Sequence, residues 1–337
     1  MAAPPPVSIL LPCRDAARHL PACLDSLRAQ TLGDYELLAV DDGSRDRTRA
    51  LLEERAAADP RIRVFRAADA GLVAALRRAT SEARGALLAR MDADDEAHPE
   101  RLARQVALLA ERRELAACGT GIRYIPRRRV RGGYRRYEAW LNGLREPEDL
   151  LRDLLVECPI AHPTLMIRAS ALRALGGYRD AGWPDDYDLV LRLHAAGMRA
   201  ANLPDVLLRW RLGAARHSHV SGAYSPGAFR RCKVHFLRHG LLPPGRPAVV
   251  WGAGRVGKAF AREMLAQGLD VRAFVDLDPR KIGQEIHGAP VLDPDGFLSL
   301  EDPYVLAAVG TPGARGEIRA ALAAMGRTEV ADFRAVA

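Results

Sequence analysis

Two groups of aspartates stand where predicted strands end. Asp41 and Asp42 follow one apolar run, and Asp92, Asp94 and Asp95 follow another. Ligands of an open parallel sheet bind outside the carboxyl ends of its strands, so we expect both groups at one edge. Aspartates also form turns and helix caps, but two acidic groups at one edge favour a ligand site. Carboxylates one residue apart suit a hard divalent cation, Mg²⁺ or Mn²⁺, that takes further ligands from phosphates.

A glycine-rich turn is a second candidate site. Gly252, Gly254 and Gly257 follow an apolar run and open a predicted helix, and Asp276 ends the next run roughly 20 residues on, which is the dinucleotide-binding pattern. Such glycines permit a tight turn and the close approach of a phosphate to the helix N-terminus. The pattern predicts a Rossmann-like fold. It leaves open whether the turn binds a nucleotide-type ligand or has a structural or docking role.

Alternating strands and helices must position the aspartates. Apolar runs predict strands at Val7–Leu11, Tyr35–Val40, Ile62–Phe65 and Ala86–Met91. Helical spacing is found at Leu20, Cys23, Leu24 and Leu27, over Leu72–Ala83, and from Pro99 onward. This alternation predicts an α/β fold with a mainly parallel sheet flanked by helices.

A proline-rich linker, Leu241–Pro247, separates two predicted domains. We expect a larger domain over residues 1–243 and a smaller α/β domain over residues 244–337. The smaller domain has predicted strands and helices at Ala248–Trp251, Arg255–Gln267, Val271–Val275, Val305–Val309 and Gly313–Met325.

Composition and charge narrow the class of protein. The 337 residues are 48% apolar and 27% charged, as in a globular protein of two domains. No uncharged apolar run approaches the roughly 20 residues that span a bilayer, so we expect at most peripheral membrane contact. Five scattered cysteines without a C-x-x-C pair indicate a reduced, cytoplasmic protein.

The net charge of +8 is nearly all arginine, and the densest basic run is Arg127–Arg136. This run lacks helical periodicity and is not accompanied by a nucleic-acid-binding motif. We therefore expect a solvated or substrate-facing loop there, and no nucleic-acid partner.

The ordered motifs resemble those of family 2 glycosyltransferases over about residues 5 to 240. The matching segments are Val7–Pro12, Val40–Ser44, Ala89–Asp95, His162–Thr164, Gly176–Tyr178 and Asp185–Arg192. The resemblance implies a GT-A fold and inverting transfer of a sugar from a nucleotide-sugar donor to an acceptor hydroxyl. It also implies a role in glycan or cell-surface polysaccharide biosynthesis, with a glycan or lipid-linked acceptor that the sequence does not identify.

The resemblance also implies roles for the residues that bind the donor. Asp42 would contact the nucleotide base, with Pro12 and Arg14 close by. Asp92 and Asp94 would form the Asp-x-Asp pair that binds the divalent cation and the diphosphate.

The same resemblance places the catalytic base at Asp186, preceded by Asp185 where the family more often has Glu. A carboxylate near the acceptor can take the hydroxyl proton as that oxygen attacks the anomeric carbon. Asp188 is a competitor, but on a helix it would point about 200° away from Asp186. Carboxylates at a helix N-terminus also favour the helix dipole, and both roles are compatible.

The chain departs from the family pattern near the end of the larger domain. The family often has a histidine shortly after a Tyr/Trp-Arg pair, whereas Trp210-Arg211 is followed by Gly213 at that spacing. His217 and His219 lie further on, and we expect surface histidines there. The Gln-x-x-Arg-Trp signature of processive synthases is absent, which predicts a non-processive enzyme.

An NAD-linked sugar oxidoreductase centred on the smaller domain is the alternative. The glycine-rich turn favours it, but the smaller domain lacks a Tyr-x-x-x-Lys pair and is too short for a separate catalytic half.

Overall fold

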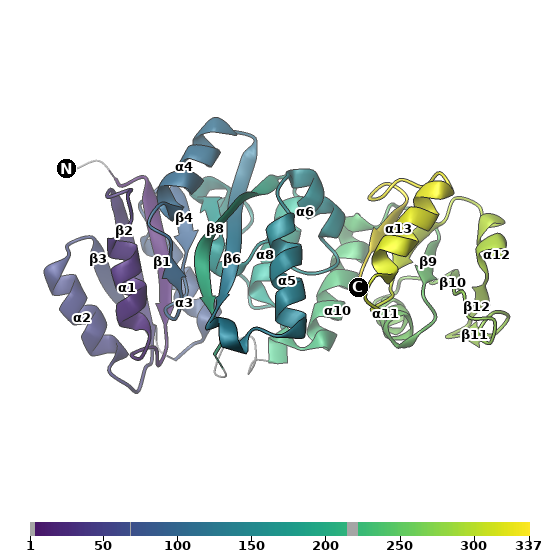
Figure 1. Ribbon diagram of the computed structural model, residues 1–337, viewed down its shortest axis with the longest axis horizontal. Helices are drawn as coiled ribbons and strands as arrows, with labels where there is room; N and C mark the ends of the chain where they lie inside the picture. The colour runs from purple at the N-terminus through teal and green to yellow at the C-terminus, as the bar shows by residue number, and fades with distance from the viewer. Residues whose placement is uncertain (1–3, 68, 214–221) are drawn as a thin grey trace. The chain divides into compact units, whose positions relative to one another are not determined.

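The computed structural model describes residues 4–67, 69–213 and 222–337 (Figure 1). His217 and His219 lie outside the described residues. Among the described residues, no helix is both long enough and apolar enough to cross a membrane.

The chain packs into two compact units. The first comprises Met1–Leu150, Pro159–Ala181 and Asp188–Val220, and the second comprises Leu151–Cys158, Gly182–Tyr187 and Ser221–Ala337. The limits 1–243 and 244–337 therefore remain a prediction, because two short earlier segments and residues from Ser221 onward group with the second unit. Helix α10 (Pro226–Phe236), which precedes the predicted linker, packs on α11 (Arg255–Ala266) of that unit.

The first unit is built on an eight-stranded, mainly parallel sheet, as predicted. Its strand order is β3-β2-β1-β4-β7-β6-β8-β5. The strands are β1 (Val7–Cys13), β2 (Tyr35–Asp42), β3 (Ile62–Ala67), β4 (Leu87–Arg90), β5 (Glu96–Ala97), β6 (Leu115–Ile125), β7 (Met166–Arg168) and β8 (Arg199–Arg211). Every residue of β1 and β2 is buried, as expected for parallel strands covered on both faces.

Helices flank this sheet (Figure 1). They are α1 (Leu20–Arg28), α2 (Thr48–Ala58), α3 (Leu72–Glu82), α4 (Arg101–Glu111), α5 (Gly132–Gly143), α6 (Pro147–Asp153), α7 (Ala169–Ala174) and α8 (Asp185–Ala195). The predicted apolar stripe of α1 is confirmed, because Leu20, Cys23, Leu24 and Leu27 are all buried. Helix α8 begins in the second unit and continues in the first from Asp188.

The basic run Arg127–Arg136 is not the loop that we predicted. Its first residues form the short 3₁₀ helix η1 (Arg127–Arg129), and α5 begins three residues later. Its arginines are exposed, as expected for a solvated run. The helical periodicity of α5 is carried by its aromatic residues, because Tyr134, Tyr137 and Trp140 recur every three positions. The ring centroids of Tyr137 and Trp140 lie 5.5 Å apart.

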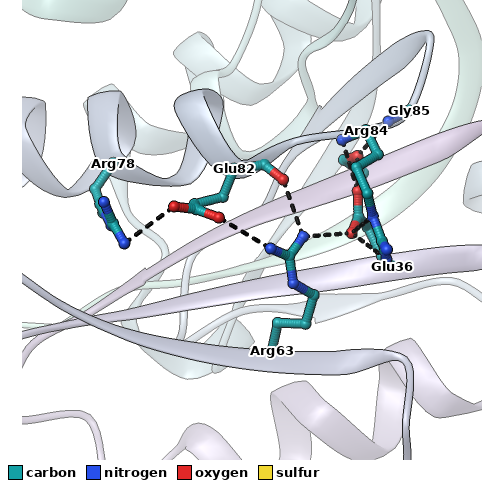
Figure 2. Close-up of polar contacts among 7 residues, drawn as sticks. Glu36, Arg63, Arg78, Glu82, Arg84 and Gly85 are labelled. Atoms are coloured by element: carbon teal, nitrogen blue, oxygen red, sulfur yellow. Dashed lines mark hydrogen bonds and ion pairs between the residues drawn. The ribbon is translucent and has the colours of Figure 1, made fainter. Parts of the chain in front are cut away.

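At the amino end of the first sheet, Glu36 lies within an ion-pair network (Figure 2). Its buried carboxylate accepts a hydrogen bond from the Ser8 hydroxyl at 2.7 Å and pairs with Arg63 at 2.9 Å and Arg84 at 2.8 Å. Arg63 also pairs with Glu82 at 2.9 Å. Burial acts to raise the pKa of Glu36, but the hydrogen bonds outweigh it and lower that pKa below its ordinary value. The network joins β1, β2 and β3 to the end of α3.

The second unit contains a smaller sheet with the order β11-β12-β10-β9-β13-β14. Its strands are β9 (Ala248–Trp251), β10 (Ala273–Val275), β11 (Glu285–Ile286), β12 (Ala289–Leu292), β13 (Tyr304–Ala307) and β14 (Phe333–Ala335). Its helices include α10 (Pro226–Phe236), α11 (Arg255–Ala266), α12 (Pro294–Leu298) and α13 (Ala314–Ala324). The parallel strands β12-β10-β9-β13-β14 follow the order third, second, first, fourth, fifth along the chain, as in doubly wound sheets.

Candidate functional site

The predicted donor-binding residues meet at the carboxyl edge of the first sheet. Strand β1 pairs in parallel with β2 on one side and β4 on the other, so the three strands end at the same edge. Pro12 lies near the end of β1 and Arg14 follows it, while Asp42 is the last residue of β2. Asp92 and Asp94 follow the end of β4.

Three aspartates after β4 form a compact carboxylate cluster. Oxygens of Asp92, Asp94 and Asp95 all lie within 4.8 Å of one another. Like charges at this separation repel, and a divalent cation that prefers oxygen ligands relieves that repulsion. The sequence-based pair of Asp92 and Asp94 therefore fits a hard cation. Asp95 is fully buried and accepts a hydrogen bond from the backbone N–H of Arg211 at 2.7 Å, which fixes one side of the cluster.

Two buried arginines lie behind this cluster, and sequence reasoning missed them. Nη2 of Arg90 is 2.6 Å from Oδ1 of Asp92, and Arg101 donates to the backbone carbonyl of Arg90 at 2.6 Å. Burial lowers the pKa of Arg101 to about 10, although the charge of Asp95 acts in the opposite direction. Arg101 is therefore still a cation at neutral pH. A charged residue inside the apolar run that forms β4 was the available signal for Arg90.

Asp42 organises the turn that precedes α3. Its buried carboxylate accepts hydrogen bonds from the backbone N–H groups of Ala70 at 2.9 Å and Gly71 at 3.0 Å. Nη1 of Arg14 lies 3.6 Å from the same carboxylate and also pairs with Asp69. The Arg14 side chain is half exposed, so solvent also reaches its guanidinium at this edge.

Thiol chemistry does not contribute to this edge. Burial, followed by the charge of Asp41, raises the pKa of the Cys13 thiol at the end of β1. Burial likewise raises the pKa of Cys23, whose thiol donates to the backbone carbonyl of Asp92 at 3.4 Å. Both thiols stay neutral and are poor nucleophiles.

Asp185 and Asp186 are the first residues of α8 and belong to the second unit. The Tyr224 hydroxyl, from the 3₁₀ helix η3 (Gly222–Tyr224), contacts both carboxylates: it lies 3.0 Å from Oδ1 of Asp185 and 3.2 Å from Oδ1 of Asp186. The backbone N–H of Tyr187 donates to the same Asp186 oxygen at 2.8 Å. Burial, followed by the charges of Asp185 and Glu157, raises the pKa of Asp186 to about 7. Sequence reasoning missed Tyr224 and Glu157 because neither lies in a motif.

Asp188, the competing candidate for the base, is held in a buried ion pair. Its carboxylate lies 2.7 Å from Nε of Arg192, one helical turn further along α8. Arg192 also donates to the backbone carbonyl of Leu175 at 2.7 Å. These contacts give Asp188 a stabilising role within the first unit.

The glycine-rich turn of the second unit requires glycine at two positions. Gly252 has a φ of 118°, a backbone conformation that residues other than glycine rarely adopt. A Cβ added at Gly257 would collide with the carbonyl oxygen of Gly252. Gly254 directly precedes α11. The turn therefore has the tight geometry that the sequence predicted.

The carboxylate of Asp276 stabilises the glycine-rich turn through hydrogen bonds. It accepts hydrogen bonds from the backbone N–H of Ala253 at 2.8 Å and from Nζ of Lys281 at 2.9 Å. Burial acts to raise the pKa of Asp276, but its hydrogen bonds outweigh it and lower that pKa. A ribose bound by Asp276 would have to compete with both partners.

A basic cavity of about 510 Å³ lies beside the glycine-rich turn. Four cationic side chains line it, those of Arg255, Lys258, Arg262 and Lys281. Lys281 pairs with Asp276, whereas no ion pair involves the other three cations in the described part of the chain. The first three recur at helical spacing along α11 and so share one face.

Comparisons with known proteins show similarity to glycosyltransferases. The family described as "Glycosyl transferase family 2" matches residues 8–176, half of the chain. EpsE of Bacillus subtilis (strain 168), described as a glycosyltransferase, is 32% identical over 66% of this chain and 78% of its own length. The O-antigen biosynthesis glycosyltransferase WbnJ of Escherichia coli is 27% identical over 70% of this chain and 89% of its own.

A solved structure shows the same fold. S. aureus TarS 1-349 in complex with UDP-GlcNAc superposes with a TM-score of 0.58 and 18% identity. The match covers 77% of this chain and 71% of that one. At this identity the likeness concerns the fold, and it agrees with the GT-A-type sheet flanked by helices.

Proposed function

The chain belongs to glycosyltransferase family 2, and we propose that it catalyses inverting, metal-dependent transfer of a sugar from a nucleotide-sugar donor to an acceptor hydroxyl. The observation that supports this most is the carboxylate cluster of Asp92, Asp94 and Asp95 at the edge where β1, β2 and β4 end. A structural neighbour, S. aureus TarS 1-349 in complex with UDP-GlcNAc, supports a nucleotide-sugar donor.

Asp92 and Asp94 would hold Mn²⁺ or Mg²⁺, which when bound neutralises the diphosphate as it leaves. Arg90 keeps the Asp92 carboxylate in place from behind, and Asp95 is fixed by the backbone of Arg211. Asp42, with Pro12 and Arg14 close by, would contact the nucleotide base.

On the acceptor side, Asp186 would act as the general base. The acceptor oxygen forms a bond to the anomeric carbon, the bond from that carbon to the diphosphate breaks, and the hydroxyl proton passes to Asp186. One displacement of this kind inverts the anomeric configuration. Asp185 adds negative charge beside Asp186, which makes the Asp186 carboxylate a stronger base.

Steady-state kinetics on aspartate variants test this assignment, once a screen of nucleotide sugars by mass spectrometry has found the donor that is hydrolysed. Asp186→Asn should lower kcat by about 10²- to 10⁴-fold with donor affinity nearly unchanged. Asp185→Asn should cost less. Asp188→Asn is the matched control: it breaks a buried ion pair, so it should lower stability by about 3–5 kcal/mol while the folded enzyme keeps its kcat. Near wild-type turnover in Asp186→Asn would show that the base lies elsewhere.

We also propose a non-processive role in cell-surface polysaccharide synthesis. The relative named for O-antigen biosynthesis supports the polysaccharide context. The acceptor would be a glycan or a lipid-linked molecule, reached from the cytoplasm with at most peripheral membrane contact. Product length by mass spectrometry tests this: one added sugar per acceptor is expected, and a ladder of long products would contradict it.

For the second unit we propose a Rossmann-like domain that binds a phosphate-bearing, nucleotide-type ligand through the basic cavity. Cations on one face of α11 favour phosphate groups, and the engagement of Asp276 disfavours ribose recognition by that carboxylate. We therefore do not propose NAD-linked oxidation. Calorimetry with ADP and NAD in EDTA, where the carboxyl edge of the first sheet has no metal, tests this on wild type and on Lys258→Ala and Arg262→Ala. ADP binding that the two substitutions weaken is expected, and equal binding in all three proteins would contradict the cavity assignment.

A further inference from the structure

One tyrosine hydroxyl joins the two carboxylates that open α8. The Tyr224 oxygen is 3.0 Å from Asp185 and 3.2 Å from Asp186, yet a hydroxyl has a single proton to donate. Both contacts are made to Oδ1 atoms. The second donor to Asp186, the backbone N–H of Tyr187, also reaches Oδ1, at 2.8 Å.

These contacts distinguish the two oxygens of Asp186. Oδ1 has two donors, whereas Oδ2 makes no hydrogen bond to any of the described residues. Asp186 is only partly buried, unlike its neighbours Asp185 and Tyr187. A carboxylate held by one oxygen presents the other in a fixed direction.

We propose that Tyr224 is a positioning residue that holds Oδ1 of Asp186 and leaves Oδ2 to take the proton of the acceptor hydroxyl. This inference rests on the proposed role of Asp186 as the base. The hydroxyl also stabilises the charged form of whichever carboxylate it binds, so it sets how much of Asp186 is ionised at a given pH.

Packing within the second unit holds Tyr224 in place. Its ring meets that of Phe229 of α10 edge-on, with centroids 6.2 Å apart. Phe229 in turn contacts Tyr187, at 5.7 Å between ring centroids. The Tyr187 hydroxyl donates to the backbone carbonyl of Leu154 at 2.7 Å. The two tyrosines thus belong to one cluster, but only the Tyr224 hydroxyl contacts the carboxylates.

The charged groups around Asp186 make its ionisation sensitive to Tyr224. Asp185 lies beside it, and Glu157 of the segment Leu151–Cys158 adds a further acidic group. Lys233 of α10 acts on Glu157 and lowers its pKa, against the larger effect of burial. Lys233 is itself buried, and its Nζ donates to the backbone carbonyl of Val156 at 2.8 Å. Hydrogen bonds from Tyr187 and Tyr224 oppose the acidic surroundings of Asp186.

The test compares Tyr224→Phe with Tyr187→Phe, since each substitution removes one hydroxyl from the same aromatic cluster. The Asp186 carboxyl is titrated by NMR in protein labelled with ¹³C-aspartate, and its signal is assigned by its loss in Asp186→Asn. The pH dependence of kcat is measured on the same proteins with the nucleotide sugar that the donor screen identifies.

Tyr224→Phe should raise the titration midpoint of Asp186 by about one pH unit, the size expected for one lost hydrogen bond to a charged group. The value of kcat should then fall about fivefold at pH 7 and recover by about pH 9, because the base is ionised again. Tyr187→Phe should lower stability and leave the midpoint in place. If Tyr224→Phe does not fold, 3-fluorotyrosine placed at position 224 alone should lower the midpoint, because its more acidic hydroxyl donates more strongly.

An unchanged midpoint in the position-224 protein, or equal shifts in both tyrosine variants, would overturn the inference. A shifted midpoint with an unshifted rate profile would support the contact between Tyr224 and Asp186 and overturn the base assignment instead. The two failures are therefore distinguishable.

Discussion

The two ends of the first sheet use carboxylates in opposite ways. At the amino end, Glu36 is surrounded by donors: a hydroxyl and two arginines approach one buried carboxylate (Figure 2). At the carboxyl end, Asp92 also pairs with an arginine, Arg90, but Asp92, Asp94 and Asp95 in addition approach one another. A carboxylate that is surrounded by cations stabilises the fold, whereas carboxylates that crowd together leave negative charge for a ligand to neutralise. The surroundings, more than the residue type, separate structure from function here.

Substitution at the carboxyl end should have the largest effect, and that effect should be on activity. Asp94→Asn removes one of three crowded charges, so we expect donor turnover with Mn²⁺ to fall by about 10²- to 10³-fold, the size seen when one electrostatic contact to a developing charge is lost. The melting temperature should not fall, because the substitution also relieves repulsion. Kinetics and thermal denaturation on the same preparation measure both. Full wild-type activity in EDTA would contradict the metal role.

Substitution at the amino end should affect stability instead. Glu36→Gln leaves Arg63 and Arg84 without their shared anion, and we expect it to lower the free energy of unfolding by about 2–3 kcal/mol. That is less than for a fully buried pair, because both arginines are partly exposed and regain water. Glu53→Gln, which loses an exposed pair with Arg49 on α2, is the control and should cost no more than about 0.5 kcal/mol. A loss of donor affinity in Glu36→Gln would contradict the division between the two ends.

Lowering the pH should also reduce the free energy of unfolding that Glu36 contributes, by a smaller amount than the substitution does. The pKa of Glu36 is below its ordinary value of 4.5 in the folded protein, so its contribution to stability is complete above that value and is lost as the pH falls through the folded pKa. The stability difference between wild type and Glu36→Gln should therefore shrink below about pH 4.5. Urea unfolding of both proteins from pH 7 to pH 3 measures it. A difference that stays constant over this range would show that Glu36 does not stabilise the fold through its charge.

Local patterns predicted four of the eight strands of the first sheet, β1 to β4, and its acidic edge. The apolar runs of β1 and β2 and the aspartates that end them follow from strand periodicity and from the topology of parallel sheets. The prediction of a loop over the basic run Arg127–Arg136 was wrong. Its many arginines drew attention away from the helical spacing of Tyr134, Tyr137 and Trp140.

Contacts between distant segments could not be predicted in this way. Tyr224 lies 38 residues after Asp186 and outside every motif, so only the fold brings its hydroxyl to the carboxylate. The hydrogen bond from the backbone N–H of Ala253 to the carboxylate of Asp276, 23 residues further along the chain, likewise depends on the fold. The grouping of Leu151–Cys158 with the second unit depends on packing and cannot be predicted from local sequence patterns.

Calorimetric titration with UDP and GDP, with Mn²⁺ and then with EDTA, tests the central claim most directly. Wild type and Glu36→Gln should bind one of the nucleotides with Mn²⁺ and lose most of that affinity in EDTA. Asp94→Asn should bind weakly in both conditions. Equal affinity with Mn²⁺ and with EDTA in wild type, or undiminished Mn²⁺-dependent binding in Asp94→Asn, would contradict the claim that the carboxyl edge of the first sheet is a metal-dependent donor site.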